Sequence, residues 1–460
     1  MRRVLLFLAL GCLCAACQGP PKPSSVVWIV VDTLRADHLE GYGYERVTSP
    51  GLRLLIDEGA LFENAFTPQP KTTPAISSML TGLYPARHGV RSLYLLLHND
   101  NRTAAELFAE AGYETAAFVS SFVMIRNFSN LAQGFATYDD FVTERELYRE
   151  NYERRAADTV ARARGWLLAR KSERPFFLFI HLIDPHGPYA PPGEFARRFH
   201  SREAVEVEGS IPDYQQIPGV RDANRYHDLY DGEIAYADQE LRRLLEFLRQ
   251  HGIFDEALIL FTADHGESMG ERGIWFEHGG DVFQENVRVP LVIKPPRHFG
   301  ARPRRLADAV SHVDLLPTAL AVAGLRVPQG LDGRDLTPLL RGEPQQPVPV
   351  FMATGGQDPS FLAVVEGTRK TILLRTPQGE SLKTFDLATD PGERTPATME
   401  DPAAARRLRL QQARWVRTRL PFTVKANPLE QALRGEFIHQ RMDRQTREDT
   451  QRLRSLGYIQ

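Results

Sequence analysis

Three apolar runs of the sequence are each followed, within a few residues, by side chains that can bind a metal ion. These side chains are Asp32, then Asp184 with His186, and then Asp264 with His265. Carboxylates and imidazoles that leave neighbouring strands together are compatible with a metal site. We therefore expect a shared site; a helix cap or a loop turn is the alternative role for Asp32 alone.

Thr72 stands where a loop is expected to enter a helix, with Pro74 near the first helical position and Gly82 at the end. A hydroxyl there commonly caps the helix. It could instead act as a nucleophile, because backbone N–H groups and the helix dipole stabilise an anion at that end. Thr73 is a second candidate for the same role.

The elements that must position these residues alternate along the chain. Strand-length apolar runs lie at Val26–Val31, Thr115–Val119, Phe176–Ile180, Leu258–Phe261 and Val289–Ile293. Helical periodicity separates them, most clearly over Tyr226–Gln250. The alternation predicts an α/β fold with a mainly parallel central sheet flanked by helices, whose ligands bind beyond the carboxyl ends of the strands.

Composition and charge indicate a compact globular protein and do not indicate a nucleic-acid-binding one. The 460 residues are 42% hydrophobic and 25% charged, and the net charge is -2 without a long block of one sign. These values are typical of a compact globular protein and give no reason to expect a nucleic-acid partner.

The N-terminus predicts export. Arg2 and Arg3 precede the apolar run Val4–Ala16, which is too short to span a bilayer stably and is typical of a signal peptide. The four residues ending at Cys17 resemble a bacterial lipobox, which implies cleavage before Cys17 and its lipidation; a plain signal peptide is the alternative. All three cysteines lie in this segment, so the mature chain has no disulfide. We expect an extracytoplasmic lipoprotein, anchored to a membrane of the bacterial cell envelope.

Composition shifts suggest five segments. They are a lipoprotein signal peptide (1–17), a linker (18–25), a catalytic domain (26–345), a small C-terminal subdomain (346–400) and a helical tail (401–460). A proline-rich stretch at 344–349 marks the main boundary. Strand-like runs at 361–365 and 371–374 predict a small antiparallel sheet that closes one side of the site.

Taken in order, the motifs resemble the sulfatase family of the alkaline phosphatase superfamily. The matching stretches are Val31–Leu39, Thr72–Gly89, Asp184–Tyr189, Tyr230–Ile234, Asp264–Glu267, Arg288–Leu291, Ser311–Thr318 and Asp390–Pro391. The resemblance implies an alkaline-phosphatase-like fold and a metal-dependent ester hydrolase.

The resemblance also implies roles for individual residues. It places Asp32, Thr72, Asp264 and His265 at the metal, with Thr72 as the nucleophile. His186 falls on a histidine that contacts the anionic group or the leaving group. His278 could be a second substrate contact, an extra ligand or a structural residue. Asp184 could bind a second metal ion or order its loop, and His312 is expected to brace the helix that follows it.

The sequence departs from the family pattern at several positions. Threonine at position 72 replaces the Cys or Ser that becomes formylglycine, so no formylglycine is expected. Ile76 replaces the arginine that pairs with it, and a Gly-Lys-Trp-type segment with the sulfate-binding lysine is absent. Thr33 stands where many sulfatases have a second aspartate. Fewer carboxylates and an imidazole favour Mn²⁺ or Zn²⁺, with Ca²⁺ or Mg²⁺ as alternatives.

These departures favour phosphoester over sulfate chemistry. The sequence therefore predicts a hydrolase that forms a covalent intermediate on Thr72 and acts on a small-molecule, glycan or lipid-headgroup ester. The site set also resembles phosphoethanolamine and phosphoglycerol transferases. A non-catalytic binding lipoprotein that retains the fold is the remaining alternative.

Overall fold

The computed structural model describes residues 24–93, 95–142, 144–145, 152–377, 379–397 and 401–428. The predicted signal peptide, the lipidation site Cys17 and most of the linker lie outside these residues, as does the tail from 429 onward. Within the described part of the chain, we find no helix with the length and apolar character needed to cross a membrane.

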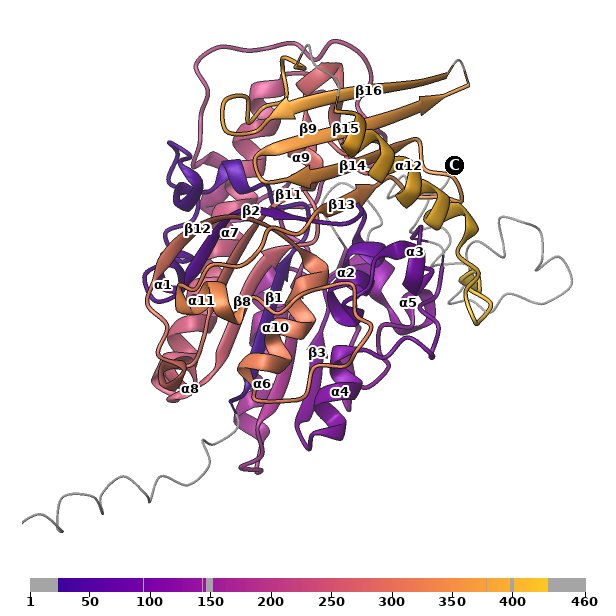
Figure 1. The fold of residues 1–460 in the computed structure, drawn as a ribbon. Helices are drawn as coiled ribbons and strands as arrows, with labels where there is room; N and C mark the ends of the chain where they lie inside the picture. The colour runs from indigo at the N-terminus through magenta and orange to yellow at the C-terminus, as the bar shows by residue number, and fades with distance from the viewer. Residues whose placement is uncertain are drawn as a thin grey trace, which may run out of the picture.

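An eight-stranded sheet forms the centre of the molecule, in the order β12-β2-β11-β8-β1-β7-β3-β4 (Figure 1). Its strands are β1 (Val26–Val31), β2 (Ala60–Phe66), β3 (Glu114–Phe118), β4 (Thr137–Asp139), β7 (Phe176–Leu182), β8 (Leu258–Ala263), β11 (Arg288–Lys294) and β12 (Arg304–Ser311). Only β11 runs antiparallel to its neighbours in this sheet. The mainly parallel α/β fold predicted from the sequence is confirmed.

The apolar runs become strands because they are buried on both faces. Every residue of β1 is buried, as is every residue of β7 and β8. Strands covered by helices on both sides read as continuous hydrophobic runs rather than as alternating patterns.

Helices cover this sheet, and short ones lie in the connections (Figure 1). They are α1 (Arg53–Ile56), α2 (Thr72–Thr81), α3 (Pro85–His88), α4 (Ala104–Glu110), α5 (Arg126–Ser129), α6 (Ala156–Ala169), α7 (Ala223–Gln250), α8 (Ile253–Glu256), α9 (Gln284–Val287), α10 (Leu315–Val322), α11 (Thr337–Arg341) and α12 (Pro402–Arg417). The predicted helix over 226–250 is α7, which begins three residues earlier because the Asp222 side chain accepts the Asn224 N–H.

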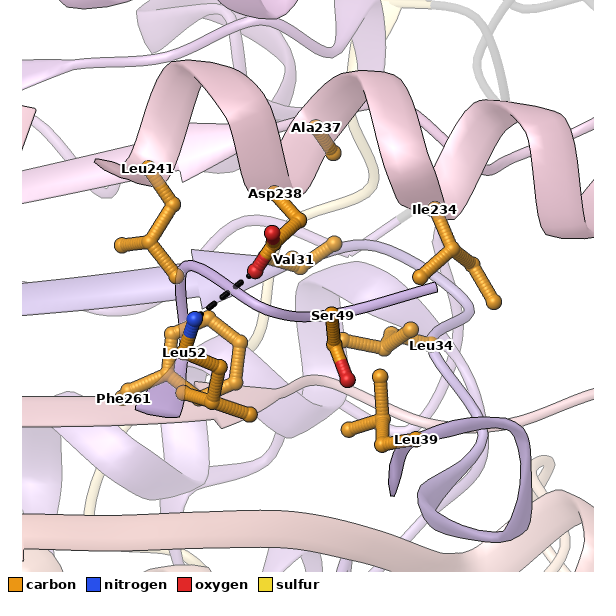
Figure 2. Close-up of a pocket in the computed structure, with 10 residues that line it drawn as sticks. All are labelled: Val31, Leu34, Leu39, Ser49, Leu52, Ile234, Ala237, Asp238, Leu241 and Phe261. Atoms are coloured by element: carbon orange, nitrogen blue, oxygen red, sulfur yellow. Dashed lines mark hydrogen bonds between the residues drawn. The ribbon is translucent and has the colours of Figure 1, made fainter. Parts of the chain in front are cut away.

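Helix α7 is tied to the loop before α1 by one buried carboxylate. Asp238 Oδ2 accepts the N–H of Gly51 at 2.6 Å, and Oδ1 accepts the N–H of Leu52 at 2.8 Å. Figure 2 shows Asp238 reaching Leu52 from the helix, among apolar side chains that include Leu241 and Ile234. The carboxylate thus satisfies two N–H groups that have no partner in a helix or sheet.

A second, four-stranded antiparallel sheet follows in the chain, in the order β13-β14-β15-β16. Its strands are β13 (Val350–Ala353), β14 (Phe361–Glu366), β15 (Arg369–Thr376) and β16 (Gly379–Asp386). One set of its side chains packs on Leu408 and Trp415 of α12, and another packs on Phe66 and Val287 of the larger unit. The predicted small antiparallel sheet is confirmed.

Two short pairs of strands lie outside these two sheets. They are β5 (Glu144–Arg145) with β6 (Tyr152–Glu153), and β9 (Ser268–Met269) with β10 (Trp275–Glu277). The second pair leads directly into His278.

Candidate active site

The carboxyl ends of three adjacent strands bring the candidate residues together. Val31, the last residue of β1, is in register with Ala263 of β8 and with Leu182 of β7. Asp32 and Asp264 each follow these positions directly, so their carboxylates leave the sheet side by side. This is the edge at which a parallel sheet binds its ligands.

His265 connects these carboxylates to Thr72. Its Nε2 atom lies 3.4 Å from Asp264 Oδ2, 3.8 Å from Asp32 Oδ1 and 3.4 Å from Thr72 Oγ1. All four side chains are at most 1% exposed. The structure therefore brings together Asp32, Thr72, Asp264 and His265, as the sequence predicts.

Thr72 is the first residue of α2 and does not cap it. The N-cap residue is Lys71, and no side chain makes a capping hydrogen bond at this end. Gly82 ends the helix in the left-handed region, with φ 66°. The Thr72 hydroxyl lies at the positive end of a ten-residue helix and faces the carboxylates.

The two carboxylates are suited to a divalent cation. Both oxygens of Asp32 and one oxygen of Asp264 are buried without a hydrogen-bond partner among the described residues. Burial and the negative charge of Asp264 raise the pKa of Asp32 well above its ordinary value. Uncompensated buried charges of this kind are costly, and a metal ion would offset that cost.

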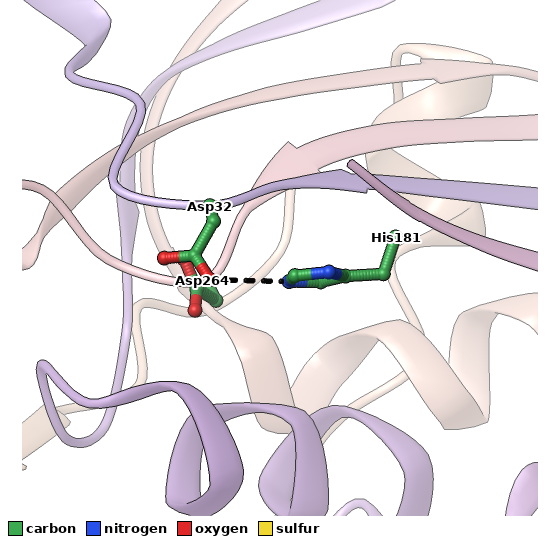
Figure 3. A group of neighbouring side chains, drawn as sticks. All are labelled: Asp32, His181 and Asp264. Atoms are coloured by element: carbon green, nitrogen blue, oxygen red, sulfur yellow. Dashed lines mark ion pairs between the residues drawn. The ribbon is translucent and has the colours of Figure 1, made fainter. Parts of the chain in front are cut away.

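His181 is a candidate ligand that the sequence analysis missed. It is the sixth residue of β7, and its Nε2 atom lies 3.4 Å from Asp32 Oδ2. One ligand atom each from Asp32, His181 and Asp264 falls within 4.8 Å of the others, and Figure 3 shows the ring directed at both carboxylates. Burial lowers the pKa of His181 to about 4, so the ring is neutral and able to bind a metal. The available signal was its position: it directly follows the apolar run 176–180.

His278 lies next to His265, and His186 lies next to His278. The ring centroids of His265 and His278 are 4.6 Å apart, and those of His278 and His186 are 5.4 Å apart. Tyr214 packs against both His186 and His278. Burial, together with the neighbouring His265, His186 and Lys71, lowers the pKa of His278 well below its ordinary value.

Glu267 positions His278. Its Oε1 atom lies 3.0 Å from Nδ1 of His278 and accepts a hydrogen bond from Gln215 Nε2 at 2.6 Å. The hydroxyl of Tyr189 also donates to Glu267. Burial raises the pKa of Glu267 to about 8. The sequence places Glu267 in a motif but does not by itself assign this contact.

Asp184 and His312 have other partners. Asp184 Oδ2 accepts the N–H of Ala156 at 2.9 Å, and its Oδ1 lies 3.4 Å from Arg155, so Asp184 binds the start of α6. This favours the loop-ordering role over the second-metal role. His312 stands just before α10, and its Nε2 lies 3.3 Å from Thr262 Oγ1.

The backbone next to Asp32 is strained. Thr33 has a φ of 51°, which is unusual for a β-branched residue. Its N–H donates to Asp264 Oδ1 at 3.1 Å, and the Tyr230 hydroxyl donates to its carbonyl at 2.8 Å. These two bonds hold a conformation that costs roughly 1–3 kcal/mol, which is typical of functional sites.

Ile76, which stands where the resemblance to sulfatases implies an arginine, is fully buried in the hydrophobic core. It therefore does not contact the candidate site as a charged residue would.

Comparison with known proteins decides the family. A sequence model of the family described as Sulfatase matches residues 24–325. The chain belongs to the sulfatase family. It is therefore a sulfatase-family hydrolase, and its large α/β unit carries the motifs of that family.

The relatives of this sulfatase-family chain are distant but extensive. It is 26% identical over 428 residues to a choline-sulfatase of Rhizobium meliloti, covering 81% of this chain and 82% of that protein. It is 26% identical over 441 residues to an arylsulfatase of Clostridium perfringens, covering 81% and 90%. Its fold is similar to the crystal structure of a phosphonate monoester hydrolase of Agrobacterium radiobacter (TM-score 0.68, 22% identity), covering 84% of this chain and 94% of that one.

Proposed function

We propose that this sulfatase-family hydrolase cleaves phosphoric or sulfuric esters through a covalent Thr72 intermediate, with phosphoesters preferred. The single observation that carries the proposal is the position of Thr72 Oγ1, 3.4 Å from His265 Nε2 at the start of α2. A hydroxyl held there, beside three carboxylate oxygens that have no hydrogen-bond partner among the described residues, is arranged as a nucleophile rather than as a cap.

A divalent metal ion would be held by Asp32, Asp264, His265 and Thr72, with His181 in reach of the same ion. When bound, such an ion lowers the pKa of a hydroxyl and neutralises charge on the ester oxygens. Mn²⁺ or Zn²⁺ suits this donor set of carboxylates and imidazoles better than Ca²⁺ or Mg²⁺.

The chain's own residues account for the bonds that form and break. Thr72 Oγ forms a bond to phosphorus or sulfur and gives its proton, directly or through water, to the unprotonated Nε2 of His278 or His186, while the bond to the leaving alcohol breaks. The leaving oxygen then takes this proton from the same imidazole. Glu267 accepts the Nδ1–H of His278, which leaves Nε2 to face the ester. Water then cleaves the Thr72 ester and regenerates the hydroxyl.

The substitutions relative to formylglycine enzymes support phosphoester chemistry. Threonine at position 72 does not yield the aldehyde, and Ile76 is packed in the core rather than directed at a charged group. The likeness in fold to a phosphonate monoester hydrolase is compatible with this preference.

The test is turnover of an aryl sulfate, an aryl phosphate and an aryl phosphodiester by the Mn²⁺-loaded protein. We expect phosphoester turnover to exceed sulfate turnover, and Thr72→Ala to abolish it while the matched Thr73→Ala retains it. Sulfate turnover at an equal or greater rate would contradict the preference. Metal binding without turnover of any ester would favour a binding lipoprotein, and transfer to an added alcohol would favour a transferase.

We also propose that the protein is a lipoprotein of the cell envelope, anchored through Cys17. The lipobox-like residues before Cys17 support this. Replacing Cys17 with Ser should move the protein from the membrane fraction to the soluble fraction on sedimentation of lysed cells. A Cys17→Ser chain that still sediments with membranes would contradict the anchor.

A further inference from the structure

Lys71 is a cationic residue at the site that the proposed reaction does not use. It directly precedes Thr72 and is the N-cap residue of α2, with extended backbone angles of φ -150° and ψ 143°. Its side chain is half-buried. Placing an ammonium partly out of water has a cost, so an ammonium at this position calls for a partner.

The side chain of Lys71 occupies the space that Gly279 leaves open because glycine has no side chain. A Cβ atom at position 279 would lie 2.4 Å from Lys71 Cε and 3.1 Å from Nζ. The lysine side chain therefore runs along the backbone of the residue that follows His278. Any side chain at position 279 would have to displace it.

The ammonium lies within electrostatic range of His278 but has no close anionic partner. In the described parts of the chain, we find no hydrogen bond or ion pair of Lys71 Nζ. The carboxylate of Glu277 attracts it, but Glu277 is exposed to solvent. The positive charge of Lys71 therefore lies next to Gly279 and close to His278, on the residue that directly precedes Thr72 at the start of α2.

We propose that Lys71 is a specificity-determining residue whose ammonium binds an anionic oxygen of the ester substrate. The inference rests on the proposed function, because it assigns Lys71 to the same site. Gly279 holds the lysine by leaving room for its stem, and Lys71 supplies a charge that selects anionic phosphoryl or sulfuryl groups over neutral esters.

The test is calorimetric titration of inorganic phosphate and inorganic sulfate into the Mn²⁺-loaded and the metal-free protein. Lys71→Met keeps the length of the stem and removes the charge. Gly279→Ala keeps the charge and displaces the stem. Alanine at position 279 also strains the backbone, because Gly279 has a positive φ. This strain is the same whether residue 71 is lysine or methionine. The double variant Lys71→Met/Gly279→Ala therefore separates the strain from the displacement of the lysine. Lys383→Met, on the exposed outer strand β16, is the matched control for a lost charge.

Lys71→Met is expected to weaken phosphate binding by about 10-fold or more, the effect of losing one charge-assisted hydrogen bond. Gly279→Ala should weaken it in the presence of Lys71 but not further in Lys71→Met, and Lys383→Met should leave it unchanged. With an anionic ester, Lys71→Met should raise KM more than it lowers kcat.

Unchanged phosphate affinity in Lys71→Met overturns the inference, as does a wild-type protein that binds neither anion. The proposed function fails separately, through absence of Thr72-dependent turnover. Phosphate binding that depends on Lys71 in a protein without turnover would refute the proposed function and leave the anion subsite standing.

Discussion

Three histidines at the site, His186, His265 and His278, have the Nδ1 atom beside a hydrogen-bond acceptor. His265 Nδ1 lies 2.9 Å from the carbonyl of Gly266, and His186 Nδ1 lies 2.8 Å from the carbonyl of Gly187. A carbonyl can only accept, so these Nδ1 atoms carry a proton, and in the neutral ring Nε2 is then unprotonated. In His265 the Nε2 atom faces the carboxylates of Asp32 and Asp264. A ring with its proton on Nδ1 is the tautomer that binds a metal ion through Nε2.

Loss of the His181 side chain should weaken metal binding. The ring contributes a neutral donor within 3.4 Å of Asp32, so His181→Ala should lower the affinity for Mn²⁺ and Zn²⁺ by about 10-fold or more, measured by calorimetry. His98→Ala is the matched control, because that ring stacks on Phe422 and is not part of the carboxylate cluster. Equal affinity in His181→Ala and wild type would remove His181 from the site.

The residues that the sequence could identify are those that directly follow apolar runs. Asp32 and Asp264 stand out because a charged residue at the end of a fully buried strand calls for a partner. The sequence does not single out His181, because it lies inside β7, one residue before the strand ends, whereas Asp32 and Asp264 follow the ends of their strands. The role of Glu267 depends on a loop that returns His278 to it, which short-range patterns do not encode.

At the scale of elements, three adjacent parallel strands and one helix position the site. β1, β7 and β8 were predictable because both faces of each are buried. β12 was not predicted, because most of its residues are only half-buried or exposed and its pattern resembles a loop. The sequence did not predict β2 either, because Glu63 and Asn64 interrupt its apolar run.

The link between α7 and the loop before α1 should make stability depend on pH. Burial raises the pKa of Asp238 to about 7 from 3.8, against the opposing effect of the two N–H groups that it accepts; Glu40 raises this pKa and Arg198 lowers it. Between pH 3.8 and about 7, the Asp238 carboxyl is protonated in the folded protein and ionised in the unfolded chain. The contribution of Asp238 to stability therefore falls as pH rises from about 4 to 7 and is constant above.

Asp238→Asn cannot ionise and should lack this part of the pH dependence. We expect the wild-type protein to lose on the order of 4 kcal/mol relative to Asp238→Asn between pH 4 and pH 7.5, measured by urea unfolding at each pH. Parallel pH profiles of the two proteins would show that Asp238 keeps its ordinary pKa.

Across the whole molecule, the four-stranded sheet supports the segments that flank the site. The N–H of Ala353 donates to the carbonyl of Pro68 at 2.9 Å, close before Lys71 and Thr72. Met352 and Ile372 pack with Val282 and Phe283, which follow His278. The C-terminal unit thus holds both the segment that leads into α2 and the loop of His278.

A buried ion pair fastens this unit. Lys370 Nζ lies 2.8 Å from Glu393 Oε1, both side chains are 0% exposed, and Glu393 Oε2 accepts the N–H of Gln284 at 2.7 Å. Removing one partner should destabilise the protein by about 3–5 kcal/mol, because the other charge stays buried. Lys370→Met should therefore lower the urea midpoint more than the double variant with Glu393→Gln does. A single variant as stable as wild type would show that the pair does not hold the sheet.

Trapping the covalent intermediate tests directly whether Thr72 is the nucleophile. The Mn²⁺-loaded protein is mixed with an aryl phosphodiester, quenched in acid during turnover, and digested for high-resolution mass spectrometry. We expect a substrate-derived phosphoryl group on Thr72, absent from Thr73 and from the histidines, and no labelling or turnover in Thr72→Ala. Turnover that persists in Thr72→Ala, or a phosphoryl group on another residue, would contradict the assignment of Thr72 as the nucleophile.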